Sequence, residues 1–404
     1  MITDRAGWMS YDGTEVINSA RLASYLSDSG CIPTAGASIC VPCPELVREV
    51  SDPPFFSPQV DNAPWYDPAV PVSAEFLGVG GIDIEGLWVH PSTVVDGVIV
   101  RDMTVRAVLA GRSEAAVSYG LAWLSMALRG AYCPTGSCIG GQMCVAVACP
   151  TDTAPDPVRT LVDVSALERP EVVHVWQQQG ITWWEVEFVM RSRNPGMFQD
   201  SQINLLFSVA SGEVETVNLL DAYRRCSETV PCATDPLCPR PVIPEVPEAP
   251  IDACYPVDDF AAHRQIASVE GLSVPSWLEL VPQIAIRAGS APLRNVVIRF
   301  YQNPLGLGCD DLIAVDPCTA CTDITVLYIP AGGETTIDAR VSRAQTTCVG
   351  GDVDVPSLYG PGGRTFSWPS FSCGYGLCVE VIAASGASID AEVDVGLYTR
   401  WEAA

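Results

Sequence analysis

The stretch EVVHVWQQQGITWWEVEFVMR, residues 171–191, decides the fold expected of this chain. Residues 171–176 and 181–191 are rich in β-branched and aromatic side chains, and the turn-like run at 177–180 ends in glycine. In the second strand the apolar side chains fall on alternate positions and so share one face: Trp184, Val186, Phe188 and Met190. We therefore predict a β-hairpin with one buried face. Trp183 must then point the other way, either as an interface anchor or packed under a loop.

Outside this hairpin one long segment has the spacing of a helix. Between residues 112 and 130, apolar side chains recur at helical intervals at Val117, Leu121, Leu124 and Leu128. Ser113 is suited to cap the start of this helix and Gly130 to stop it. We predict one amphipathic helix lying on a β-structure, and a second, short helix within residues 11–27.

The second half of the chain has the pattern of short strands separated by turns. Glycine- and proline-rich turns at 330–333 and 360–363 separate several of them. This punctuation predicts a mainly β fold, with a β-sandwich in the second half. The expected strands cover residues 281–288, 295–301, 324–329, 334–342, 377–383 and 391–400.

A change of composition divides the chain. Residues 226–256 include the run PCATDPLCPRPVIPEVPEAPIDACYP, in which so many prolines favour extended backbone and oppose helix or sheet. With 404 residues the chain is too long for one ordinary core. We therefore expect a first domain at 1–225, a proline-rich linker at 226–256 and a second domain at 257–404.

The charge balance restricts the partners. The formal net charge is −26, which repels nucleic acid and anionic membrane surfaces, so we expect neither as a partner. All 22 basic residues are arginine, which suits either geometry-specific interfaces or a genome of high GC content. The longest uncharged stretch, 130–151, is broken by glycine, proline and cysteine and predicts no membrane span. Without a secretory leader, the chain is expected to be made and kept in the cytoplasm, unless it leaves inside a larger particle.

Seventeen cysteines are many for a cytoplasmic product. Three explanations remain open: disulfides formed at an oxidising stage, a zinc site using the C-x-x-C pair Cys318 and Cys321, or buried reduced thiols. The candidates for disulfides are Cys133, Cys138, Cys144, Cys149, Cys309, Cys318, Cys321, Cys373 and Cys378.

The residues that usually carry catalysis form no recognisable arrangement. His90, His174 and His263 lie outside any metal-ligand or catalytic spacing, and no phosphate-binding loop, HExxH motif or nucleophile elbow occurs. Acidic pieces at 309–311 and 351–354 could bind calcium but are more typical of solvated loops. We expect no enzyme activity, no metal and no cofactor.

Several segments, in the same order along the chain, resemble the distal tail proteins of long-tailed actinobacterial phages. In the first half these are YDGTEVINSARLASYL at 11–26, the block at 106–150 containing LAWLSMALRG, and ITWWEVEFVMRSRNP at 181–195. In the second half they are SVPSWLELVPQIAIRAGSAPLRNVVIRFYQNP at 273–304, YIPAGGETTIDAR at 328–340 and LYGPGGRTFSWPSFSCG at 358–374. The ordered series carries the resemblance, because no one motif is diagnostic.

The resemblance implies a structural protein of the virion tail tip. It implies a β-barrel-like first domain, six copies of which form a ring that joins the tail tube to the baseplate or central fibre. The implied partners are further copies of the chain, the tail tube protein and tail-tip proteins, including tail-associated lysins. A virion subunit is made in the host cytoplasm but functions outside it, where disulfides can form.

Two other functions compete with a structural role. The second domain could bind a receptor or a cell-surface glycan, with aromatic side chains such as Tyr359 and Trp368 stacking on sugars. A cell-wall hydrolase of the tail tip is disfavoured because the sequence has no catalytic constellation.

Overall fold

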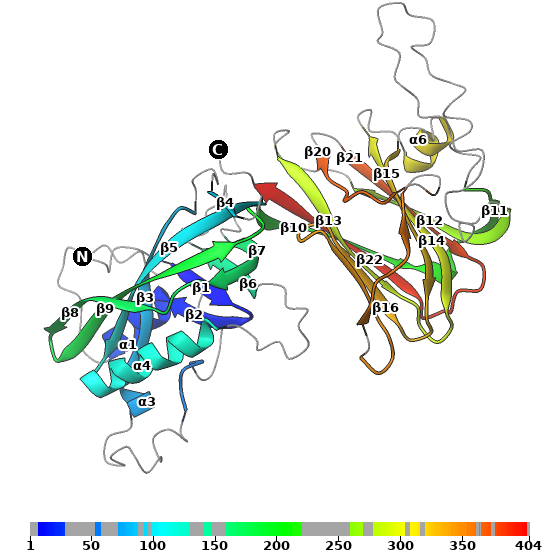
Figure 1. Cartoon of the computed structure of the whole chain (residues 1–404). Helices are drawn as coiled ribbons and strands as arrows, with labels where there is room; N and C mark the ends of the chain where they lie inside the picture. The colour runs from blue at the N-terminus through cyan, green and yellow to red at the C-terminus, as the bar shows by residue number, and fades with distance from the viewer. Residues whose placement is uncertain are drawn as a thin grey trace, which may run out of the picture. The chain divides into compact units, whose positions relative to one another are not determined.

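The computed structural model contains two compact units, each built mainly from antiparallel strands (Figure 1). The first unit comprises Met1–Gln199 and Trp401–Ala404, and the second comprises Asp200–Arg400. In the part of the chain that the structure describes, no helix is long and apolar enough to cross a membrane. The described residues are 7–28, 53–57, 72–87, 93–95, 98–129, 141–146, 158–219, 259–269, 278–303, 308–315, 320–351, 353–360, 363, 365–372 and 376–401.

The first unit is organised around one long strand pair. Strand β5 (Val98–Gly111) pairs with β9 (Ile181–Ser192) from Arg101 to Gly111. The other edge of β5 pairs with β3 (Phe76–Glu85), and the first residues of β5 pair with β4 (Thr93–Val95). The other side of β9 is shared by β8 (Glu171–Gln178) and β7 (Arg159–Ala166).

From β7 the sheet continues through short strands to the beginning of the chain. The order is β7, β6 (Gly141–Ala146), β1 (Trp8–Tyr11) and β2 (Thr14–Asn18), and β10 (Met197–Ser208) also starts beside β7. Helices α1 (Ser19–Asp28), α3 (Val72–Glu75) and α4 (Glu114–Ala127) complete the unit. The short helix expected within 11–27 is therefore α1, although residues 14–18 belong to β2.

The hairpin at 171–191 is confirmed as β8 and β9. Its turn is shorter than predicted, because only Gln179 and Gly180 separate the strands, and their φ angles of 53° and 78° suit a two-residue hairpin turn. Val186, Phe188 and Met190 are buried in the main core of the unit. Trp183 lies on the opposite face, where it stacks on Trp176 and packs against a smaller cluster containing residues of α1. The structure thus favours packing over the alternative of an exposed anchor.

Helix α4 also follows its sequence pattern. Ser113 caps it, because its hydroxyl oxygen accepts a hydrogen bond from the Ala116 amide at 3.2 Å. Val117, Leu124 and Leu128 are buried in the main core, while Leu121 is half-buried. The helix ends at Ala127, before the predicted glycine stop.

The second unit has two antiparallel sheets. One has the order β18 (Val353–Asp354), β17 (Arg343–Thr347), β16 (Glu334–Asp338), β13 (Glu279–Arg287), β22 (Glu392–Trp401) and β10, with β20 (Phe371–Ser372) beside β13. The other has the order β11 (Glu213–Val217), β12 (Phe260–Val269), β21 (Gly376–Ala384), β14 (Leu293–Asn303), β15 (Ala320–Ile329) and β19 (Leu358–Tyr359). The short helices η2 (Val209–Ser211) and α6 (Cys309–Val315) complete it.

Side chains from both sheets of the second unit form one core. Ile284 of β13 and Val395 of β22 share a buried cluster with Ile298 of β14 and Val379 of β21. All six strands predicted in the second half are present with changed bounds; the largest changes are in β15, which begins at Ala320, and in β16, which ends at Asp338. The mainly β fold is confirmed, whereas the barrel, the sandwich and the linker remain predictions.

The division of the chain differs from the expected domains. The two units divide at residue 200, inside β10, and β11 pairs with β12 from Val217↔Phe260 to Glu213↔Arg264. Residues 200–219 therefore belong to the second unit, although the sequence suggested the first domain. The predicted linker, 226–256, lies in the connection between β11 and β12 and outside the described residues.

A glycine in α4 offers a test of the core packing. A side-chain carbon at Gly120 would overlap the ring of Phe76, which Phe55 and Tyr119 hold edge-on from two sides. Glycine-to-alanine changes inside helices normally stabilise, but here we expect Gly120→Ala to destabilise by ~1–3 kcal/mol because the core becomes overpacked. Urea unfolding measures this, and Ser118→Ala on the exposed side of α4 is the control, expected to be neutral or stabilising. A stabilised Gly120→Ala protein would contradict the described packing.

Candidate functional site

The histidines and acidic residues considered from the sequence do not come together. His174 lies on β8 opposite Glu185, and Nδ1 of His263 on β12 is 3.0 Å from the carbonyl oxygen of Gly212. His90 lies outside the described residues. Within the described ranges, no group of three or more His, Cys, Asp or Glu side chains is placed to hold a metal ion. The acidic piece at 309–311 begins helix α6, so it is not the solvated loop that the sequence suggested.

Two of the candidate cysteines form a disulfide. Cys309 at the start of α6 is bonded to Cys378 on β21, with an S–S distance of 2.05 Å across a sequence separation of 69 residues. The bond fixes α6 against the six-stranded sheet, and both half-cystines pack beside Tyr301 and Ile313.

Cys144, another disulfide candidate, has a free thiol. Its cross-strand neighbours are Ser10 and Thr160, so no second sulfur lies opposite it, and its Sγ is 3.6 Å from the Thr160 hydroxyl. The prediction for Cys144 is therefore corrected. Cys348 is also free, and Cys321 lies in β15. The candidates outside the described residues are Cys133, Cys138, Cys149, Cys318 and Cys373, so the proposed Cys318–Cys321 zinc pair stays a prediction.

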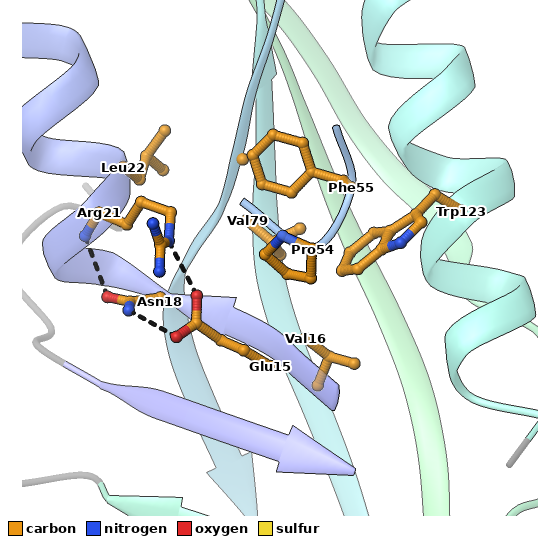
Figure 2. Close-up of a pocket in the computed structure, with 10 residues that line it drawn as sticks. Glu15, Val16, Asn18, Arg21, Leu22, Pro54, Phe55, Val79 and Trp123 are labelled. Carbon is orange, nitrogen blue, oxygen red and sulfur yellow. Dashed lines mark hydrogen bonds and ion pairs between the residues drawn. The ribbon is translucent and has the colours of Figure 1, made fainter. Parts of the chain in front are cut away.

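A small pocket in the first unit lies between β2, α1 and α4 (Figure 2). Glu15, Asn18 and Arg21 form its polar side, and Pro54, Phe55 and Trp123 form an apolar side. Its volume is about 10 Å³, which is close to the minimum for one water molecule. The pocket is therefore too small for a substrate.

The polar side of the pocket is a closed set of hydrogen bonds. Glu15 accepts from the Arg21 Nε at 2.9 Å and, on its other oxygen, from Asn18 at 3.0 Å and the Trp8 indole at 3.2 Å. Asn18 also caps α1, because its Oδ1 accepts from the Arg21 amide at 3.0 Å. Burial is the largest single effect and lowers the pKa of the Arg21 guanidinium, but the hydrogen bond and charge of Glu15, together with Tyr25, outweigh it, so the pKa is raised. Both carboxylate oxygens are occupied, so Glu15 ties β1, β2 and α1 together rather than acting as a base.

The second unit has a larger set of buried charges, on the face of the six-stranded sheet that points away from the main core. The Nε of Arg299 on β14 lies 2.8 Å from Asp323 on β15, and its Nη1 lies 3.6 Å from Glu380 on β21. Glu380 is also 2.5 Å from the Nε of Arg264 on β12. Asp323 and Glu380 are 2% and 1% exposed, so both carboxylates are shielded from solvent.

Tyr301 completes this group, which we call the ion cluster: Arg264, Arg299, Tyr301, Asp323 and Glu380. Its hydroxyl donates to Glu380 at 2.7 Å. Burial, followed by the nearby Glu380 carboxylate, raises the pKa of Tyr301 well above its ordinary value, so the phenol stays protonated and keeps donating. The cluster joins four neighbouring strands, and every charge has an opposite partner. The role of the ion cluster is therefore structural.

The ion cluster was not predicted from the sequence. The signal that could have found it is a charged residue among apolar ones inside a strand: Glu380 lies within LCVEVIAA at 377–384, and Arg299 follows Ile298. The two aromatic residues suggested for glycan stacking differ in their exposure to solvent. Trp368 is 37% exposed and meets Phe366 edge-on at 4.8 Å, whereas Tyr359 is half-buried in β19.

The ion cluster can be tested by removing one charge. We expect Glu380→Gln to destabilise the protein by ~3–5 kcal/mol, because it leaves the buried guanidinium of Arg299 and the half-buried one of Arg264 short of a counter-charge. Glu334→Gln is the matched control, since its partner Arg287 is 44% exposed and the pair should be worth less than ~1 kcal/mol. Chemical unfolding of both variants measures the difference. If both variants lost the same free energy of unfolding, the charge of Glu380 would contribute no more to stability than an exposed one, and the prediction would be wrong.

The comparisons with known proteins give a likeness to solved structures alone. No protein-family model matches the chain, and no curated protein matches it. Among solved structures, the chain is similar to the crystal structure of the SPP1 Dit protein, described as a paradigm of the hub adsorption apparatus in phages that infect Gram-positive bacteria. The alignment covers 98% of this chain and 99% of that chain, at 12% identity and a TM-score of 0.31. A likeness at this level does not establish a shared fold or function.

Proposed function

We propose that this chain is a structural protein of a phage tail tip, whose first unit assembles with further copies into a ring. In that role it connects the tail tube to the baseplate or central fibre and carries out no reaction. The proposal rests on the ordered sequence resemblance to distal tail proteins, together with where the resembling segments lie in the structure.

Those segments form the core elements of both units. The segment at 181–195 contains β9, the central strand of the first unit, and LAWLSMALRG contains the second half of α4, which packs on its core. The segment at 273–304 contains β13 and β14, one strand from each sheet of the second unit. Because buried core positions specify a fold, similarity concentrated there supports a common architecture more strongly than similarity in loops.

The partners of such a hub follow from the same proposal. They are further copies of this chain, the tail tube protein and the tail-tip proteins, including tail-associated lysins. The net charge of −26 keeps separate copies soluble before assembly and disfavours direct contact with nucleic acid. The protein would then be made in the host cytoplasm and function at the virion tail tip.

A second candidate function is glycan or receptor binding by the second unit. The observation that favours it is the exposed ring of Trp368, which Phe366 supports edge-on. If Trp368 stacks on sugar, the full-length chain should bind host cell-wall glycans in a glycan array, and Trp368→Ala should lose at least tenfold in affinity. Equal binding by the variant would remove Trp368 from that role.

The hub proposal predicts assembly of the purified chain. We expect chromatography with light scattering, with or without the tail tube protein, to find a species near six times the 43.1 kDa chain mass. Negative-stain images of that species should show closed rings. A chain that stays monomeric across concentration, also in the presence of the tube protein, would contradict the proposal.

A further inference from the structure

Exposed apolar side chains on the strands of the first unit gather in two places. One is β8 with Leu167, which lies four residues before the strand; Leu167, Val172, Val173 and Val175 are exposed. The other is the β4–β5 hairpin, where Val94 and Ile99 are exposed. Val175 and Val94 are each 61% exposed, which is unusual for valine on a strand. We call these two surfaces the β8 edge and the β4 hairpin.

The β8 edge has the properties of a strand that can accept another strand. Among the described residues β8 pairs with β9 alone, so its second edge presents peptide N–H and C=O groups outward. It has eight residues, of which Glu171 is the only one with a formal charge, and it contains no proline. Soluble proteins usually protect such an edge with charges or proline, and β8 does not.

The β4 hairpin offers a second strand edge at a different location. β4 pairs with residues 98–100 at the start of β5, and it has no charged residue. β8 lies near the other end of β5, because Val175 is opposite Trp184, which in turn pairs with Leu109. Ile99 and Leu109 are about ten residues apart along β5, or roughly 33 Å at the rise of an antiparallel strand. The two surfaces are therefore separate.

Charge restricts where a second copy of the chain, the occupant that the proposed ring requires, can bind. Two copies that each carry −26 repel one another over most of their surfaces. They can approach where charge is scarce, and the β8 edge and the β4 hairpin are two such surfaces in the described part of the first unit. A closed ring needs two different surfaces on each subunit, one for each neighbour, and the first unit supplies two.

We propose that the β8 edge of one copy pairs, strand to strand, with the β4 hairpin of the next copy, so that repetition of this one contact builds the ring. This inference rests on the proposed hub function, and it names the surfaces by which that ring forms. The pairing would bury Val175 and Val94 and satisfy the outward backbone groups of both strands.

Two substitutions test the two surfaces of this contact one at a time. Val175→Glu places a charge on the β8 edge, and Val94→Glu places one on the β4 hairpin. Both positions are exposed, so the folded subunit should keep its circular dichroism spectrum and melting temperature. Val214→Glu is the matched control, because Val214 on β11 is 59% exposed in the second unit.

Each of the first two variants should need at least a tenfold higher concentration than the wild type to form rings, while Val214→Glu should assemble normally. Mixing the two variants provides the decisive measurement. The Val175→Glu chain keeps an intact β4 hairpin and the Val94→Glu chain keeps an intact β8 edge, so the mixture should form a 1:1 dimer that stops there. If one of the two variants carries a mass tag, light scattering distinguishes this 1:1 dimer from a dimer of identical chains.

The outcomes distinguish this inference from the hub proposal. If the wild type forms rings and either variant does so equally well, the pairing is wrong and the hub proposal stands. If both variants are monomeric but their mixture gives no heterodimer, the two surfaces do not meet each other and the pairing is again wrong. A wild type that stops at a two-fold dimer through β8 also overturns it. If the wild type never assembles, both the strand pairing and the hub proposal are wrong.

Discussion

The hydrogen-bonded ladder between β5 and β9 is the constraint on which the first unit depends. It runs from Arg101↔Ser192 to Gly111↔Thr182. Because side chains alternate along a strand, this register places Val105, Leu109, Val186 and Phe188 on the face that α4 covers. Each such side chain contributes about 1.5–3 kcal/mol when fully buried, and a slip by one residue would turn all of them to the other face.

The second unit sets its register with charge as well as with apolar packing. Arg299 lies between Asp323 and Glu380, on the strands to either side of it, so a slip of either neighbour would separate a buried ion pair. Buried ion pairs add little net stability compared with apolar residues of similar size, but breaking one is costly. The ion cluster is therefore better explained as selecting one strand arrangement than as the source of the unit's stability. The Cys309–Cys378 bond holds α6 beside it.

Local features were predicted from the sequence, and features made by distant segments were not. The β8–β9 hairpin and α4 were recognised because their alternation and spacing are complete within about twenty residues. The ion cluster was missed because its members are contributed by strands separated by as many as 116 residues. The division into units at residue 200 also depends on distant segments. Proline-rich composition indicates where strands are absent, whereas the boundary depends on β11 pairing with β12 across that same segment.

Every ion pair in the described structure that involves a basic side chain uses arginine, because the sequence contains no lysine. A guanidinium group does not react with the acylating reagents that label ammonium groups near neutral pH. Amine-directed cross-linkers, dyes and surface-coupling resins therefore have no side chain to attack on this protein. Mapping neighbours within an assembly can instead use its abundant carboxylates, because the cysteines that are free among the described residues, Cys144 and Cys348, are both half-buried.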